Sequence, residues 1–441
     1  MPQRQLKTAR RIPPSHPLYG RKTWLPRMSD GSARVFAAIL RSIGVDAEVT
    51  PPSDTRTLEL GGRATSGDEC YPLKVTLGDV LRIAEQPGFD PKKNAIFMAT
   101  GHGPCRFGQY VPYFRAALKR LGYGEVAIVS PSAEQGYSDF GELSGVFTRS
   151  AWRAIVAGDI LLKLLLKTRP YEAEPGSADL ALEESVEALC KVLEVAYPDT
   201  SAQMSALQEA LLQVRERFRT LRIEADSSRP LIGVVGEIFC RLNQFSNSEL
   251  VRRLEEAGAE VWMNDISEWI WYINADQFRA LRIAGRRISL EALGARVRNH
   301  FQHRDEHELL RLFREDFRGY EEPEDIHVVL DYAETYLPYF GVNGEMVVNV
   351  GKAVYFARKG LDGVIDISPF GCMNGIVGES IYPRVSRDNG GIPIRNFYFD
   401  GTRSDLDRDI GIFLELARSY RNTKPRQRRH ATIAKAALAA H

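Results

Sequence analysis

The sequence predicts an α/β protein of two Rossmann-like domains, each with a doubly wound parallel sheet, joined by a helical connector. Three observations support this prediction. Short apolar runs alternate with amphipathic helical stretches near both ends of the chain, as in successive βαβ units. The stretch between them is almost continuously helical. At 441 residues the chain is also too long for one ordinary core.

The first domain is predicted over residues 22–147 and opens with the order strand, helix, strand. Ser29 or Asp30 can cap its first helix, and Gly44 ends that helix. A turn-rich loop is expected before Cys70, which opens a further helix. The predicted strands of this domain lie at 22–26, 47–49, 94–100 and 126–129. The glycines of the expected loop are Gly61, Gly62 and Gly67.

Residues 148–229 are predicted to form the helical connector, because long apolar helical faces replace the short strands there. The strand pattern then returns, and the second domain is predicted over 230–420. Ser246 and Glu249 have the spacing of a capping box for the helix that follows them. The predicted strands of this domain lie at 231–235, 261–263, 363–367 and 394–399.

Composition indicates a soluble globular protein without a polyelectrolyte partner. The chain has 58 basic and 57 acidic residues, and 44% of its residues are hydrophobic. Nucleic-acid binding is not expected, because a face that binds nucleic acid usually brings an excess of basic residues. Basic residues do gather in the two end segments, 1–21 and 421–441, where solvated tails are the favoured interpretation.

Neither a signal peptide nor a membrane span is predicted, so the chain is expected in the cytoplasm. Residues 1–20 lack the apolar core of a signal peptide. The most apolar predicted helix, at 152–166, carries Arg153, Asp159 and Lys163, which excludes a span. In a reducing compartment the five cysteines are expected to be free, catalytic or metal-bound rather than paired in disulfides.

Three cysteines lie in turn-forming surroundings that a thiol in a core rarely has. Cys105 occupies a strand-to-helix turn, Gly103-Pro104-Cys105-Arg106-Phe107-Gly108, and Cys372 follows a strand in Pro369-Phe370-Gly371-Cys372. Cys70 opens a helix, whose dipole is expected to favour the thiolate. Ligands bind open α/β sheets at the carboxyl edge. If the two domains face each other across a cleft, Cys70, Cys105 and Cys372 are expected to converge on one metal centre.

More than one metal centre fits these residue types. A tetrahedral zinc site would need a fourth ligand, for which His102 is available. Three thiolates suit a [4Fe–4S] cluster with one iron left open. Cys190 lies on an apolar helical face, and Cys240 has no flanking Gly or Pro, so both are interpreted as structural thiols.

Four neighbours are candidates for supporting roles. Arg106 could bind an anionic ligand or tune the potential of a cluster, and an ion pair that braces the loop is the alternative. His102 could relay a proton to a leaving hydroxyl, although a solvated or structural histidine is favoured. Glu69 and Glu379 are further candidate acids.

The cysteine segments resemble the motifs of the 2-hydroxyacyl-CoA dehydratase and benzoyl-CoA reductase family, which includes the D-component of 2-hydroxyglutaryl-CoA dehydratase. The chain looks most like the branch related to the C-terminal part of large CoA-enzyme activase proteins. The similarity runs over most of residues 22–415. The segments that carry it are 66–72, 103–110 and 368–373, with Gly236-Glu237, Phe245-Ser246-Asn247 and Phe399-Asp400-Gly401-Thr402.

This resemblance implies a [4Fe–4S] cluster, or a related double-cubane cluster, held by Cys70, Cys105 and Cys372 between two Rossmann-like domains. It also implies a separate ATP-dependent activator that reduces the cluster, which then passes the electron to an acyl-CoA thioester and generates a ketyl radical. The implied activity is that of an (R)-2-hydroxyacyl-CoA dehydratase-like lyase or a related reductase in anaerobic metabolism. A second homologous subunit or a homodimer is implied too.

Alternatives from other classes stay open. They are a non-catalytic iron–sulfur protein, acting as an electron carrier or a scaffold, and a zinc-binding protein. The chain has no CoA signature that can be read from its residues and no ATPase motif of its own. Activator-dependent turnover of an acyl-CoA would indicate the enzyme, whereas a stable cluster indifferent to activator and ATP would indicate the scaffold.

Overall fold

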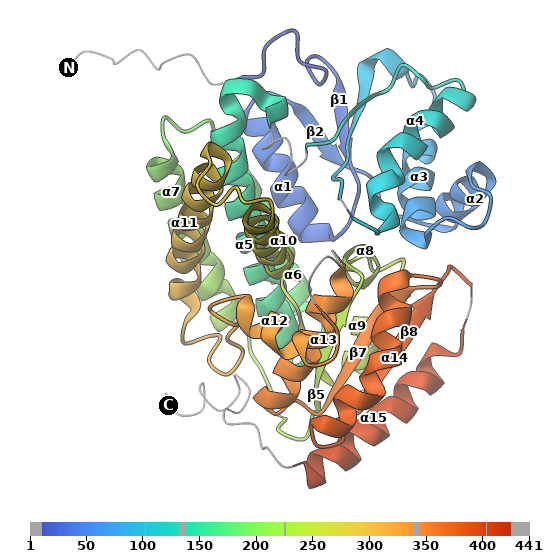
Figure 1. The fold of residues 1–441 in the computed structure, drawn as a ribbon, viewed down its shortest axis with the longest axis vertical. Helices are drawn as coiled ribbons and strands as arrows, with labels where there is room; N and C mark the ends of the chain where they lie inside the picture. The colour runs from blue at the N-terminus through green and yellow to red at the C-terminus, as the bar shows by residue number, and fades with distance from the viewer. Residues whose placement is uncertain are drawn as a thin grey trace.

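The protein is an α/β molecule with two separate parallel sheets, as predicted (Figure 1). The computed structural model describes residues 11–101, 103–131, 138–224, 226–338, 344–402 and 404–424. Each sheet has four strands, and every strand pair is parallel. The strand order is β2-β1-β3-β4 in one sheet and β6-β5-β7-β8 in the other. The two sheets therefore repeat one topology, consistent with two Rossmann-like units.

The first sheet follows the predicted order of elements. Its strands are β1 (Lys22–Leu25), β2 (Asp46–Val49), β3 (Asn94–Phe97) and β4 (Ala127–Val129). The helices between and beside them are α1 (Asp30–Ser42), α2 (Thr55–Ala64), α3 (Tyr71–Ala84) and α4 (Tyr110–Arg120). Val35, Ile39 and Leu40 of α1 are buried, which confirms the predicted apolar face of that helix.

The loop predicted around Gly61 and Gly62 is wrong, because both residues lie inside α2. Gly61 lies at a close contact between α2 and α3, together with Gly78 of α3. A Cβ at Gly61 would lie 2.1 Å from the carbonyl oxygen of Lys74, and one at Gly78 would lie 2.0 Å from that of Thr57. Only a residue without a Cβ permits this approach, so helix contact rather than a turn explains Gly61.

Long helices fill the stretch predicted as the connector. They are α5 (Ser144–Thr168), α6 (Ser177–Leu193) and α7 (Thr200–Arg219). Trp152, Leu189 and Leu211 from these helices share one buried core with α1 of the first sheet. Helix α5 also contacts β6 of the second sheet, so it touches both halves of the molecule. None of the helices in the described ranges is both long and apolar enough to cross a membrane.

The second sheet is more deeply buried than the first. Every residue of β5, β6 and β7 is buried, as expected for parallel strands covered on both faces. Its strands are β5 (Leu231–Gly236), β6 (Glu260–Met263), β7 (Gly363–Pro369) and β8 (Ile394–Phe399). The helices of this part are α8 (Ile238–Leu242), α9 (Leu250–Glu256), α10 (Ile266–Ile283), α11 (Leu290–Leu310), α12 (His327–Glu334), α13 (Glu345–Lys359), α14 (Met373–Asp388) and α15 (Leu406–Thr423).

The predicted capping box of Ser246 and Glu249 is wrong. Glu249 lies directly before α9 in a left-handed conformation, with φ +58°, and its side chain makes no capping hydrogen bond. The Oδ1 atom of Asn247 accepts the hydrogen bond from the N–H of Leu250 instead, at 3.2 Å. The start of the helix was predicted correctly, but the side chain of Asn247 accepts the capping hydrogen bond.

The halves meet through loops and helix starts at the carboxyl edges of their sheets. Tyr71, the first residue of α3, belongs to the apolar core of the second sheet together with Val234 and Ile367. Asn243, directly after α8, donates a hydrogen bond to the carbonyl oxygen of Arg27 at 2.7 Å. Figure 1 shows α8 at this junction, below α3 and α4. Ligands of doubly wound sheets bind at this edge.

Candidate functional site

Each of the three predicted cysteines directly precedes a helix. Cys70 precedes α3, Cys105 precedes the short 3-10 helix η2 (Arg106–Gln109), and Cys372 precedes α14. Their backbone angles are closely similar: φ −57° and ψ 135° at Cys70, φ −66° and ψ 129° at Cys105, φ −67° and ψ 124° at Cys372. One local geometry, repeated in three loops, therefore presents the three thiols.

Arg106 ties the three cysteine loops together. Its guanidinium donates a hydrogen bond to the carbonyl oxygen of Asp68, two positions before Cys70, at 2.8 Å. It donates another to the carbonyl oxygen of Gly371, directly before Cys372, at 2.9 Å. Because Arg106 itself follows Cys105, all three loops meet around one side chain. Arg106 therefore braces the loops, which was one of its predicted roles. It does so through hydrogen bonds to carbonyl groups rather than through an ion pair.

A neighbouring donor favours the thiolate at each cysteine and so lowers its pKa. The donors are the Tyr110 hydroxyl for Cys70, the Phe107 N–H for Cys105 and the Gly375 N–H for Cys372. Hydrogen bonds to sulfur are among the features that tune the potential of iron–sulfur clusters. A Cβ at Gly375 would lie 2.6 Å from the Ser368 hydroxyl oxygen, so glycine lets the first turn of α14 lie close to β7.

The thiols are poor acids in the chain alone. Burial raises the pKa of Cys70 and Cys372 to about 12 and that of Cys105 to about 11, and the nearby Glu237 adds to the rise in all three. The expectation that the helix dipole favours the Cys70 thiolate is therefore wrong for the chain by itself. Metal ligands must be deprotonated, so a cationic metal centre would have to stabilise these thiolates.

Sequence analysis did not select three charged residues of this region: Glu237 and Glu345, which act on the thiols, and Arg241, which acts on these two carboxyl groups. Glu237 directly follows β5, the strand next to β7. Glu345 begins α13, and its carboxylate accepts a hydrogen bond from the N–H of Ile238 at 2.9 Å. Arg241 of α8 is 4% exposed, and its Nε has no hydrogen-bond partner among the described residues. Burial raises the pKa of both carboxyl groups, and Arg241 counteracts the rise in each.

A sequence signal for Glu237 existed. Gly236-Glu237 resembles Gly371-Cys372: a glycine at the end of a strand, or two residues after it, is followed by the residue that directly precedes a helix. Both glycines have positive φ, +127° at Gly236 and +73° at Gly371, a conformation that favours glycine. We call Cys70, Cys105, Cys372, Glu237, Glu345 and Arg241 together the cysteine centre.

The two cysteines interpreted as structural differ in position. Cys190 lies at the margin of the core of the first half, and its charged neighbours are Arg41, Arg34 and Glu194. Cys240 is fully buried in α8, and its pKa is raised by burial, by Glu237 and then by Cys70 and Cys372. Cys240 therefore lies next to the cysteine centre, which its lack of flanking turn residues did not suggest.

Three further residues were candidates in the sequence: His102, Glu69 and Glu379. His102 lies outside the described residues. Glu69 accepts hydrogen bonds from the N–H groups of Ser66 and Gly67 and from the Tyr113 hydroxyl. Burial opposes the ionised form of Glu69, but these hydrogen bonds outweigh it and lower the pKa to about 2, so Glu69 is a poor proton donor. The carboxylate of Glu379 accepts a hydrogen bond from Tyr398 at 2.7 Å.

Within the described ranges, no group of three or more His, Cys, Asp or Glu side chains is arranged to hold a single metal ion. This finding concerns sites for one ion, such as zinc. The thiolates of a cubane bind different iron atoms, so the finding does not test a cluster. The cluster expected at Cys70, Cys105 and Cys372 stays a prediction.

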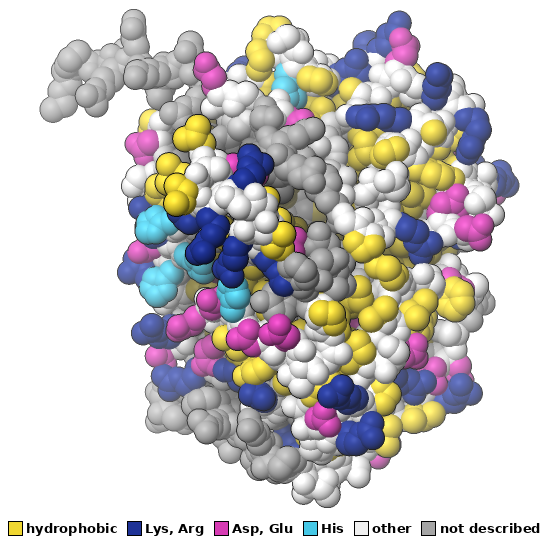
Figure 2. Space-filling model, in the orientation of Figure 1, with side chains coloured by type: hydrophobic (Ala, Val, Ile, Leu, Met, Phe, Trp, Pro, Cys, Tyr) yellow, Lys and Arg dark blue, Asp and Glu magenta, His cyan; other side chains and the backbone are white. Residues whose placement is uncertain are grey.

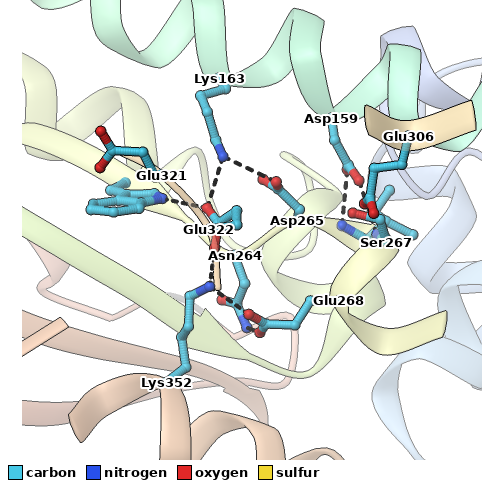
Figure 3. Close-up of polar contacts among 12 residues, drawn as sticks. Asp159, Lys163, Asn264, Asp265, Ser267, Glu268, Glu306, Glu321, Glu322 and Lys352 are labelled. Carbon is cyan, nitrogen blue, oxygen red and sulfur yellow. Dashed lines mark hydrogen bonds and ion pairs between the residues drawn. The ribbon is translucent and has the colours of Figure 1, made fainter. Parts of the chain in front are cut away.

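A second group of buried charges lies between α5 and the second sheet (Figure 3). Lys163 lies 3.0 Å from a carboxylate oxygen of Asp265 and 2.7 Å from one of Glu322. Lys352, which is fully buried, contacts Glu322 and Glu268. We call these five residues the buried ion network. Each of its carboxylates contacts a lysine, and each lysine contacts two carboxylates.

The buried ion network has no room for a substrate. The cavity beside Lys163 has a volume of about 10 Å³, about enough for one water molecule. Asp159, next to this group in Figure 3, accepts hydrogen bonds from the N–H groups of Ile266 and Ser267, both at 2.9 Å. These contacts fix α5 to the start of α10. The network is therefore a structural junction between the halves.

Comparison with known proteins adds no assignment. Neither a family model nor a curated protein matches the chain. The resemblance to the 2-hydroxyacyl-CoA dehydratase and benzoyl-CoA reductase family therefore stays a prediction.

Proposed function

We propose that the chain is an iron–sulfur protein of the 2-hydroxyacyl-CoA dehydratase type. It would accept low-potential electrons from an ATP-dependent activator and use them in reductive dehydration or reduction of an acyl-CoA. The observation that carries the proposal is the meeting of three cysteine loops around Arg106, although residues 106 and 371 are 265 positions apart. A thiol needed only for core contacts requires no such convergence.

The residues of the cysteine centre fit a cluster. Cys70, Cys105 and Cys372 would hold it, and each has a neighbouring donor that favours the charged form of its sulfur. When bound, such a cluster supplies single electrons at low potential. Arg241 supports the binding of a second molecule beside the cluster. A buried guanidinium whose Nε has no partner among the described residues can bind a carbonyl or anionic oxygen of such a molecule.

The surface beside Cys372 supports a protein partner. Three large apolar side chains next to it in the sequence are exposed: Phe370 by 70%, Met373 by 38% and Ile376 by 53%. Figure 2 shows hydrophobic side chains gathered on one face where the two halves meet. Exposed apolar side chains that cluster together usually mark an interaction site. An activator that delivers electrons would have to bind close to the centre, and this surface offers the place.

A non-catalytic electron carrier or scaffold is the second candidate, because such a protein needs no substrate cavity. An open hollow of about 450 Å³ in the described part of the chain is lined by Arg215, His307 and Arg311. An acyl-CoA substrate would need a cavity beside the thiols. Turnover of an acyl-CoA in the presence of activator and ATP separates the two candidates.

The proposal is tested by metal analysis of two cysteine variants. Cys105→Ser and Cys190→Ser each replace a partly buried thiol in the first half of the chain. After anaerobic purification, we expect iron and sulfide in the wild-type chain and in Cys190→Ser, and their loss in Cys105→Ser. Equal iron in the two variants would count against the proposal, and zinc without sulfide would favour the zinc-binding alternative.

A further inference from the structure

Glu237 occupies the same kind of position as the cysteines. It directly follows β5 and precedes α8, with φ −65° and ψ 129°. The corresponding angles are −66° and 129° at Cys105, and −67° and 124° at Cys372. One backbone geometry thus presents three thiols and one carboxylate at sheet edges that face each other.

Neighbouring strands bring Glu237 to the cysteines. β5 and β7 are adjacent and parallel, with Gly236 paired to Ile367. The N–H of Glu237 donates to the carbonyl oxygen of Ile367 at 2.9 Å. Glu237 and Cys372 therefore leave the same edge of one sheet, at the point where strand order reverses. The electrostatic effect of Glu237 on all three thiols agrees with this placement.

The Glu237 carboxylate is held in place and keeps capacity for a further ligand. Oε1 accepts from the N–H of Phe239 at 3.1 Å, and Oε2 accepts from the N–H of Cys240 at 2.7 Å. Each carboxylate oxygen has a further lone pair. No ion pair among the described residues includes Glu237, and the residue is only partly buried. A cation at the cysteine centre would therefore find an oriented carboxylate that has no salt-bridge partner among the described residues.

Capping of α8 does not by itself explain a glutamate here. Aspartate, serine, threonine and asparagine are preferred at the residue before a helix, because their shorter side chains reach the exposed N–H groups. Asp54 before α2 and Asp199 before α7 follow this rule. The additional methylene of Glu237 is not needed for capping, and it extends the reach of the carboxylate.

We propose that Glu237 is the fourth protein ligand of the metal centre, and that its carboxylate binds the iron that Cys70, Cys105 and Cys372 leave open. This inference rests on the proposed function, since it presupposes the cluster. The chain itself, rather than solvent alone, would then hold the fourth iron.

Two substitutions separate ligation from capping. Glu237→Gln removes the charge and keeps one oxygen, so it can accept only one of the two capping hydrogen bonds. Glu237→Asp keeps the charge and suits the cap, but it shortens the reach. Asp199→Asn makes the same chemical change in another carboxylate that caps a helix, at the start of α7, and Cys240→Ser removes the thiol next to the cysteine centre. These two variants are the matched controls.

Each full-length chain is loaded anaerobically with ⁵⁷Fe and sulfide and then oxidised mildly. Mössbauer spectroscopy reports the environment of the fourth iron, and electron paramagnetic resonance follows the three-iron cluster left when that iron is lost. We expect both Glu237 variants to lose the fourth iron at least about tenfold faster than wild type, the scale on which metal sites respond to loss of a supporting group. Both controls should match the wild-type rate.

The outcomes distinguish this inference from the proposed function. A wild-type rate in Glu237→Gln would overturn the inference and leave the cluster intact. A wild-type rate in Glu237→Asp alone would reduce Glu237 to a cap, and rapid loss in Cys240→Ser would assign the fourth position to that thiol. If the wild-type chain takes up no iron, the proposed function fails and the inference falls with it. Circular dichroism before loading shows whether each variant folds. If Glu237→Gln does not fold, the rate of iron loss in Glu237→Asp decides whether Glu237 is a ligand.

Discussion

The buried ion network and the cysteine centre are two groups of ionisable side chains at the junction of the two halves. In the network, Lys163 and Lys352 contact all three carboxylates, at 2.7 Å and 3.0 Å for Lys163. In the cysteine centre, the buried Arg241 acts on the carboxyl groups of Glu237 and Glu345, and the exposed Arg106 acts on the thiols of Cys70 and Cys105. The two groups thus differ in how their negative charge is balanced.

Their acidities reflect this difference. Burial favours the neutral form of Glu322, but Lys163 and Lys352 outweigh it and lower the pKa of Glu322 to about 2. At Asp265 and Glu268 burial outweighs the lysines and raises the pKa. Burial and the neighbouring Glu237 raise the pKa of Glu345 well above its ordinary value. Each carboxylate of the network therefore has a lysine partner as the chain folds, whereas no salt bridge among the described residues includes Glu237 or Glu345, and an added positive group would supply that partner. Incomplete charge balance is typical of a binding site rather than a structural junction.

Breaking the network is expected to have the largest effect on stability. Lys352→Met keeps an apolar chain of similar length but leaves Glu268 and part of Glu322 without their cation. Removing one partner of a buried ion pair typically costs about 3–5 kcal/mol. We therefore expect the free energy of unfolding, measured by urea titration, to fall by that amount with or without metal.

Lys359→Met is the control for this prediction. Lys359 pairs with Glu321 at 3.0 Å on the surface, and its side chain is 31% exposed. Exposed pairs contribute about 0–1 kcal/mol. Equal destabilisation by the two substitutions would show that the buried ion network has no special structural role.

Glu345→Gln is expected to have a smaller effect of opposite sign in the metal-free chain. Burial raises the pKa of Glu345 above its ordinary value of 4.5, so the folded chain keeps a proton that the unfolded chain loses. The stability of the wild-type chain should therefore fall relative to the variant as pH rises above 4.5, by at most about 1.4 kcal/mol per pH unit.

Urea unfolding of both metal-free chains at about pH 5 and about pH 8 measures this difference. The gap between the variant and the wild-type chain should widen at the higher pH. A gap that narrows would mean that Glu345 is stabilised in its ionised form, and the cysteine centre would then resemble the buried ion network.

Local signals made the strands and the cysteine loops predictable. The apolar run at 231–235 became β5, and the run at 363–367 became β7. Turn residues placed Cys70, Cys105 and Cys372 at helix starts, where the structure has them. These signals suffice because strand burial and helix entry depend on neighbouring residues.

Long-range pairing left no comparable signal. Lys352 contacts Glu268 and Glu322, which lie 84 and 30 positions away, and charged residues within a helical pattern are ordinarily solvated. In the sequence, the charge of Lys163 served only to exclude a membrane span. The structure shows that its side chain is buried. Gly61 was assigned to a loop because a single sequence does not distinguish a turn glycine from one that lets two helices approach.

Removing the brace between the cysteine loops should have the smallest effect on stability. Arg106 donates one hydrogen bond to Asp68 in the first half and one to Gly371 in the second. Arg106→Met removes both and leaves the carbonyl groups to solvent, because the arginine is exposed. We expect a loss of about 1 kcal/mol together with faster amide hydrogen exchange in the segments around Cys70 and Cys372.

Arg120→Met is the matched control, since Arg120 donates to the carbonyl oxygen of Ala64 within the first half alone, at 2.8 Å. Its loss should leave exchange around Cys372 unchanged. If Arg106→Met also leaves exchange around Cys372 unchanged, the contact with Gly371 does not hold the second half against the first. The three thiols would then be kept together by the apolar contacts of Tyr71 and by α8, and the cysteine centre would owe its geometry to the same kind of junction as the buried ion network.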